Sequence, residues 1–127
     1  MRLLLDTHVL LWWMQDDKRL GKNVCEQIMD ESIEIFISAA TIWEMSIKRA
    51  KGRLDYDTDE LYAEMEKLNF QRLNVTYDHA EASGELPLHN NDPFDRLIVA
   101  QARVEGLDLV TYDKALKPYG VPVLRRK

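Results

Sequence analysis

Short apolar runs that alternate with helical segments are the feature of this sequence that most restricts its fold. The short runs cover residues 2–5, 32–37, 72–75, 107–111 and 121–124, and runs of this length are typical of buried strands. The run over residues 32–37 is also rich in β-branched and aromatic residues, which favour strands. Strands separated by helices form parallel sheets, because each helix returns the chain to the starting edge of the sheet. We therefore predict an α/β fold in which a mostly parallel five-stranded sheet lies between two layers of helices.

The segments between these runs have the apolar spacing of helices. Helices are predicted over residues 9–14, 21–31, 39–50, 58–70, 77–83 and 93–105. Ser38 is a plausible N-cap for the helix over residues 39–50, which Gly52 ends, and Gly106 ends the helix over residues 93–105. Since the 127 residues contain no repeat or linker, we expect one domain over residues 1–127.

Composition indicates the cellular setting. The single Cys25 cannot form an internal disulfide, so a reducing cytoplasm is the expected location. No apolar stretch approaches the length that crosses a bilayer, and no membrane association is expected.

Two aspartates follow predicted strands directly. Asp6 comes after the first strand, and Asp113 lies two residues beyond the fourth. In open parallel sheets, ligands bind at the carboxyl ends of the strands, so strand direction places both carboxylates where a ligand would bind. A simpler role for each is to cap the helix that follows it.

Asp92 and Asp95 need different interpretations. Asp92 precedes Pro93 and therefore fits the N-cap of a helix whose first residue is the proline. Asp95 is in the first turn, where a carboxylate interacts favourably with the helix dipole. Because most of this helix is apolar, we expect Asp95 to point into the protein or a cleft.

Glu44 interrupts an apolar helix, next to Trp43 and Met45. One explanation is a surface ion pair with Lys48, four residues later. The other is that Glu44 joins the three aspartates. The spacing alone allows both.

Carboxylates gathered in one partly dry pocket must either take up protons or bind cations. Their hard oxygens suit Mg²⁺ or Mn²⁺ rather than Zn²⁺. The histidines His8, His79 and His89 have no zinc-ligand spacing. Together, Asp6, Glu44, Asp95 and Asp113 are the candidate catalytic residues, and Asp6, Asp95 and Asp113 the candidate metal ligands.

Four blocks that contain these acids resemble one family. They are LLLDTHVLLW (residues 3–12), SAATIWEM (38–45), NDPFDRLIVAQA (91–102) and LVTYD (109–113). In this order they are similar to the PIN domain and, more narrowly, to VapC-type ribonuclease toxins of toxin–antitoxin systems. The resemblance runs from Met1 to about Val123 and includes every acidic position of the motif.

The resemblance implies a metal-dependent endoribonuclease on a parallel five-stranded sheet, a homodimer, and a cognate antitoxin that covers the active-site groove. Thr7 and Thr111 match hydroxyl positions beside the acids, where they would support the ligands. The expected cofactor is Mg²⁺ or Mn²⁺.

Basic residues cluster in two places, although the formal net charge is −5. Omitting the four candidate acids leaves 17 basic against 18 acidic residues, so one pocket accounts for most of the acidic excess. If RNA is the substrate, Lys48, Arg49 and Lys51 are expected to bind its backbone, or else the C-terminal residues Arg125, Arg126 and Lys127. A solvated helix end is the alternative for each run.

Two other functions fit parts of the pattern. An aspartate after the first strand also suits a phosphatase of the haloacid-dehalogenase kind, but that class usually has a second aspartate where this chain has His8. A non-catalytic module that binds RNA or protein would use Trp12, Trp13 and Trp43 as a partner surface, although such aromatic side chains are more often core.

Overall fold

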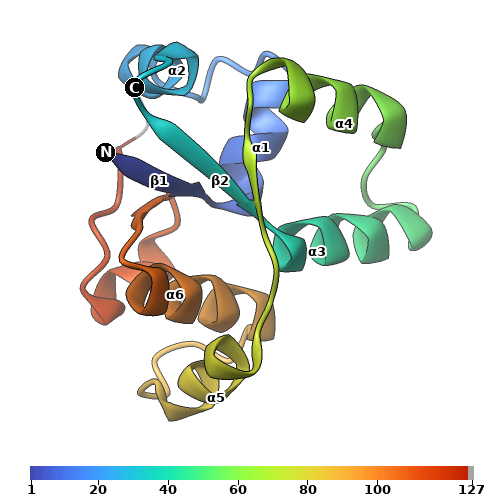
Figure 1. Cartoon of the computed structure of the whole chain (residues 1–127). Coiled ribbons are helices and arrows are strands. Elements are labelled where there is room, and N and C mark those ends of the chain that lie inside the picture. The colour runs from blue at the N-terminus through green and yellow to red at the C-terminus, as the bar shows by residue number, and fades with distance from the viewer. Residues whose placement is uncertain (126–127) are drawn as a thin grey trace.

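The computed structural model describes residues 1–125 and contains one parallel sheet (Figure 1). Its strands are β1 (Arg2–Leu5), β2 (Glu34–Ser38), β3 (Gln71–Leu73) and β4 (Asp108–Val110), in the order β3-β2-β1-β4. Leu4 of β1 pairs with Phe36 on one side and with Leu109 on the other. Because every pair is parallel, the carboxyl ends of the strands share one edge.

The predicted fifth strand, over residues 121–124, is wrong. The chain leaves β4 through a 3₁₀ helix, η1 (Lys114–Tyr119), and turns at Gly120, whose φ is 81°. Residues 121–124 have no strand conformation, although the Leu124 N–H donates to the Thr111 carbonyl at 2.9 Å. Pro122 has no N–H for a ladder, which explains why the segment runs near β4 without pairing. The described sheet therefore has four strands.

Helices cover both faces of the sheet, as predicted (Figure 1). They are α1 (Thr7–Met14), α2 (Lys22–Met29), α3 (Ala39–Ala50), α4 (Thr58–Lys67), α5 (Tyr77–Glu85) and α6 (Pro93–Glu105). Alternate residues of β1 enter different cores. Leu3 and Leu5 pack with α1, α2 and α4, whereas Leu4 packs with α6.

Capping residues explain where several helices begin and end. Asp6 caps α1, which therefore starts at Thr7, two residues before the predicted start. Helix α6 has the predicted bounds, from the Asp92 cap to Gly106, whose φ of 67° suits glycine. Helix α4 ends at Lys67, earlier than predicted, and Asn69 beyond it has a φ of 56°.

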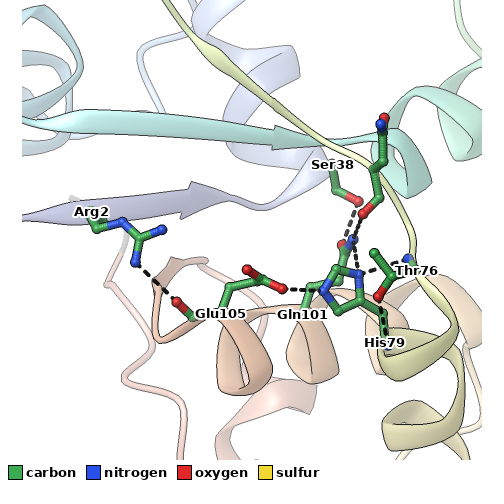
Figure 2. A network of polar contacts seen from close by, with 7 residues as sticks. Arg2, Ser38, Thr76, His79, Gln101 and Glu105 are labelled. Carbon is green, nitrogen blue, oxygen red and sulfur yellow. Dashed lines mark hydrogen bonds and ion pairs between the residues drawn. The ribbon is translucent and has the colours of Figure 1, made fainter.

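A buried polar network connects the helices and strands that position the candidate site (Figure 2). The Ser38 hydroxyl, at the end of β2, donates to the side-chain carbonyl of Gln101 in α6. The amide of Gln101 lies 3.3 Å from Nδ1 of His79 in α5, and His79 Nε2 contacts Glu105 at 2.7 Å. Since the Thr76 N–H donates to Nδ1, the His79 proton is on Nε2. The network thus ties α5 and α6 to the edge where α3 begins.

Among the described residues, no helix is both long enough and apolar enough to cross a membrane.

Candidate active site

Asp6 lies in the interior at the carboxyl end of β1. Its side chain is buried, with the whole residue only 3% exposed. The Thr7 N–H donates to Oδ1 at 2.7 Å, and the Thr111 hydroxyl donates to Oδ2 at 2.6 Å. Burial raises the pKa of Asp6 above its ordinary value, and the Thr111 hydrogen bond opposes that rise. Asp6 is therefore a capping residue and a buried carboxylate at once.

Asp95 is a partly buried carboxylate in the first turn of α6. Asp92 is the N-cap, as predicted, and accepts from the N–H groups of Phe94 and Asp95. The side-chain amide of Asn90 donates to Asp95 Oδ2 at 3.0 Å. Burial, and after it the charges of Asp92, Asp6 and Asp113, together raise the pKa of Asp95 to about 7, although the Asn90 hydrogen bond lowers it. The electrostatic effect of Asp6 and Asp113 indicates that Asp95 lies near both of them.

Asp113 is half-buried and lies just beyond β4. Its Oδ1 accepts from the Ala115 N–H at 2.9 Å and so caps η1. Its own N–H donates to the Thr111 hydroxyl at 3.0 Å. That hydroxyl contacts both Asp6 and the Asp113 backbone, and it therefore couples the ends of β1 and β4.

Glu44 forms one of the two interactions that its spacing allowed, the ion pair with Lys48. The predicted pair with Lys48 forms, with Nζ 3.1 Å from Oε2. Yet Glu44 is only 7% exposed, so the pair is not a surface one. Its other oxygen accepts from the Thr7 hydroxyl at 2.7 Å. Thr7 therefore links the two acids: its hydroxyl donates to Glu44 and its backbone N–H donates to Asp6. Lys48 compensates the charge of Glu44.

The donor set fits a hard divalent cation in its chemistry. Asp6, Asp95 and Asp113 supply carboxylate oxygens of the kind that Mg²⁺ and Mn²⁺ prefer. Part of the rise in the pKa of Asp95 comes from negative neighbours, a repulsion that a cation would remove. Within residues 1–125, however, no three Asp, Glu, His or Cys side chains are grouped so that they could hold a metal ion. The protein side chains alone do not form a complete cage.

A cleft of about 1060 Å³ opens beside Asp6 and Asp113. Much of the cleft wall consists of aromatic and basic side chains, namely His8, Trp12, Tyr112, Lys114, Lys117 and Arg125. The C-terminal segment supplies Val123 and Leu124 to the same wall. The acids are thus accessible to a ligand from this side.

Comparison with known proteins identifies the fold. The model of the PIN domain family matches residues 3–121. This chain belongs to the PIN domain family. It is 28% identical over 122 residues to Ribonuclease VapC22 of Mycobacterium tuberculosis, a match that covers 94% of this chain and 93% of the relative.

Solved structures agree with this PIN fold. A chain of a toxin–antitoxin complex from Klebsiella pneumoniae is 25% identical, with a TM-score of 0.63 and coverage of 97% of this chain and 96% of that one. A chain of VapBC2 from Rickettsia felis, crystallised with a promoter DNA fragment, has a TM-score of 0.70 at 16% identity and 98% coverage of both chains.

The predicted RNA-binding residues lie around the end of α3, and two of them already have partners. Lys48 pairs with Glu44. Arg49 donates to the Thr58 hydroxyl at 2.7 Å, and its guanidinium carbon lies 4.3 Å from the centre of the Tyr56 ring. Lys51 is exposed at the C-cap. None of the three is among the residues that line the cleft.

Sequence reasoning missed two lysines at the PIN-domain cleft. Lys114 directly follows Asp113, and Lys117 lies three residues after Lys114; both line the cleft. Three residues make one turn of a 3₁₀ helix, so the two side chains project from the same edge of η1. Their spacing after the strand-end aspartate was the available signal. Of the predicted basic tail, Arg125 lines the cleft, and Arg126 and Lys127 lie outside the described residues.

Replacing Thr111 with valine should destabilise this PIN domain by about 1–3 kcal/mol, because a buried Asp6 oxygen and the Asp113 N–H both lose a partner. Urea unfolding measures the change. Thr111→Ser keeps the hydroxyl and should lose clearly less stability. Equal stability of the two variants would show that the hydroxyl has no such role.

Proposed function

We propose that this PIN domain, over residues 1–127, is a metal-dependent endoribonuclease and the toxin of a type II toxin–antitoxin pair. The observation that supports this most strongly is that Asp6 and Asp113 line an open cleft and lie near enough to Asp95 for their charges to raise its pKa. The similarity to a protein named a ribonuclease and to a chain of a toxin–antitoxin complex points the same way.

In this proposal, Asp6, Asp95 and Asp113 hold Mg²⁺ or Mn²⁺. Bound Mg²⁺ usually keeps several waters and takes one or two carboxylates together with substrate phosphate, so a complete protein cage is not required. The cation would supply Lewis acidity and lower the pKa of a bound water.

The surrounding residues hold these carboxylates in place. Thr111 and the Thr7 N–H each bind one oxygen of Asp6, and Asn90 binds Asp95. Glu44 acts as the fourth catalytic acid through its contact with the Thr7 hydroxyl. The phosphatase alternative is weaker, because that class usually has a second aspartate at the position that His8 occupies here.

The proposed partner is a cognate antitoxin. Trp43 is 58% exposed and packs edge-on against Phe94, with 4.9 Å between the ring centroids. Trp43 and Phe94 directly precede Glu44 and Asp95 in the chain, so a protein bound to this aromatic pair would lie next to the helix turns that carry the two acids. Dimerisation and a cytoplasmic location stay predictions.

The test is to purify the protein with and without a co-expressed small partner and to sequence the ends of treated RNA. We expect cleavage in Mg²⁺ or Mn²⁺, none in EDTA, and suppression by the partner.

With limiting Mg²⁺, cleavage should increase from pH 6 to pH 8, because Asp95 must lose its proton to bind the cation. RNA binding without cleavage in any divalent metal would favour the non-catalytic module instead.

A further inference from the structure

Gln101 is a fully buried amide side chain in α6 that bridges several elements of the fold (Figure 2). Its side-chain carbonyl accepts from the Ser38 hydroxyl, where β2 passes into α3. Its amide nitrogen lies 3.3 Å from Nδ1 of His79 in α5, and it donates to the Asn74 carbonyl, just beyond β3, at 3.4 Å. One side chain thus connects α6 with α5 and with the ends of β2 and β3.

The orientation of this amide is determined by its neighbours. The Thr76 N–H donates to Nδ1 of His79 at 3.1 Å, so Nδ1 carries no proton and is an acceptor for Gln101. The Asn74 carbonyl is an acceptor as well. Gln101 therefore turns its NH₂ group toward these two acceptors and its carbonyl toward Ser38. A reversed amide would place its oxygen against two other acceptors in the interior, which is costly.

The same orientation fixes the hydroxyl at the start of α3. Ser38 donates its proton to Gln101, so a lone pair of the same oxygen accepts from the Ala40 N–H at 2.9 Å and caps α3. Ser38, His79 and Gln101 are each at most 1% exposed, and bulk water is therefore excluded as a substitute partner. The N-cap of α3 depends on an amide that is held in α6.

Two contacts show how α3 and α6 lie against each other. The first is the Ser38–Gln101 hydrogen bond, and the second is the edge-on packing of Trp43 against Phe94. A residue later in α3 thus meets a residue earlier in α6, so the two helices run in opposite directions along their contact.

Each of these helices carries a candidate catalytic acid at the same distance from the Ser38–Gln101 bond. Glu44 is six residues after Ser38, and Asp95 is six residues before Gln101, which is about 9 Å along the helix axis in each case. Since the helices run in opposite directions, this hydrogen bond sets the register that brings the two acids to the same level. A slip of one residue would change their relative height by about 1.5 Å, which is enough to impair catalysis.

We propose that Gln101 is a positioning residue of the proposed active site: it sets the register of α3 against α6 and thereby the relative position of Glu44 and Asp95. His79 holds the Gln101 amide in the orientation that this register requires. The inference rests on the proposed function for its effect on cleavage, whereas the register itself can be measured in the metal-free protein.

The first test is made by NMR in EDTA. Gln101→Met keeps the length of the side chain and removes the amide, and Ser38→Ala removes the same hydrogen bond from the other side. In both variants we expect a shift of the Trp43 indole N–H signal, which reports the packing on Phe94 and is assigned by its loss in Trp43→Phe. The matched control is Val24→Ala, which leaves a cavity in the core that α6 does not join and should keep the wild-type signal.

The inferred amide orientation has its own measurement on the wild type. The ¹⁵N chemical shifts of the His79 ring distinguish its tautomers, and we expect the proton on Nε2 and none on Nδ1. A proton on Nδ1 would reverse the Gln101 amide and overturn the proposal. A Trp43 signal that moves no further in Gln101→Met and Ser38→Ala than in Val24→Ala would overturn it as well.

Cleavage in saturating Mg²⁺ measures the effect on activity, at a temperature where every variant is folded. We expect kcat of Gln101→Met to fall by about 10- to 100-fold, the range typical of groups that orient a metal site from outside, with little change in KM. Val24→Ala should stay within a few-fold of wild type.

The two measurements separate this inference from the proposed nuclease activity. If the Trp43 signal shifts as expected but no metal supports cleavage by the wild type, the register inference stands and the nuclease proposal fails. If the wild type cleaves RNA and Gln101→Met cleaves it as fast as Val24→Ala does, the nuclease proposal stands and Gln101 is not a positioning residue.

Discussion

Asp95→Asn is expected to reduce RNA cleavage by more than about 100-fold without destabilising the metal-free protein at pH 8. Outer partners of a bound metal typically contribute about 10- to 100-fold, and a direct ligand should contribute more. Asparagine keeps the shape of the side chain and removes the charge that burial and three acidic neighbours oppose. Initial cleavage rates in saturating Mg²⁺ and thermal unfolding in EDTA measure the two effects.

The pKa of Asp95 also determines how the stability effect depends on pH. The pKa of this carboxyl is raised in the folded protein, from 3.8 to about 7, so the folded state binds the proton more tightly than the unfolded chain does. Its favourable contribution is fully present below pH 3.8 and is lost as the pH rises through about 7. Asp95→Asn should therefore raise the unfolding temperature, relative to wild type, more at pH 8 than at pH 5. Added Mg²⁺ should reduce that difference by stabilising the wild type alone.

Asp92→Asn is the matched control, since it removes the same charge three residues earlier. Asparagine is as good an N-cap as aspartate, so the bonds to Phe94 and Asp95 can be kept. We expect cleavage within a few-fold of wild type. Wild-type cleavage by Asp95→Asn in Mg²⁺ would remove Asp95 from the catalytic site, and equal losses in both variants would indicate a structural effect on α6.

Much of the fold could be predicted because local patterns and tertiary structure agree. The strand before Asp6 and the Asp92–Gly106 limits of α6 depend on apolar spacing and on capping, which are local properties. The fifth strand failed because residues 121–124 have strand composition, but a proline and a preceding turn prevent pairing. Composition shows that a segment is apolar, not whether a partner strand can reach it.

The position of a candidate site residue could be predicted only where a single strand or helix determines it. Asp6 and Asp113 follow strands, and Asp95 could be separated from Asp92 by capping geometry alone. Glu44 could not be resolved, because its burial depends on Thr7, which lies 37 residues away in sequence. Lys114 and Lys117 were missed for the same reason, since the cleft is assembled from residues as far apart as Asp6 and Arg125.

Arg96 has a structural role that the sequence did not reveal. The residue is only 9% exposed, and its guanidinium donates to the Ser83 and Leu86 carbonyls at the end of α5, at 2.7 and 3.0 Å. It also reaches the carbonyls of Pro87 and Asn90, at 3.0 and 3.4 Å. The negative end of the α5 dipole partly compensates its charge. Arg96 therefore holds the loop from which Asn90 contacts Asp95.

Arg96→Met is expected to reduce the free energy of unfolding by about 3–5 kcal/mol, because it strips a buried carbonyl cluster of its donors. Chemical unfolding measures this loss. Arg96→Lys keeps the charge and the length but lacks the planar fork that reaches several carbonyls at once, so it should recover only part of the stability. In both variants cleavage should fall further than the folded fraction explains, since Asn90 no longer fixes the Asp95 carboxylate. If Arg96→Lys matches wild type in both stability and cleavage, charge alone is sufficient at this position and the fork has no positioning role.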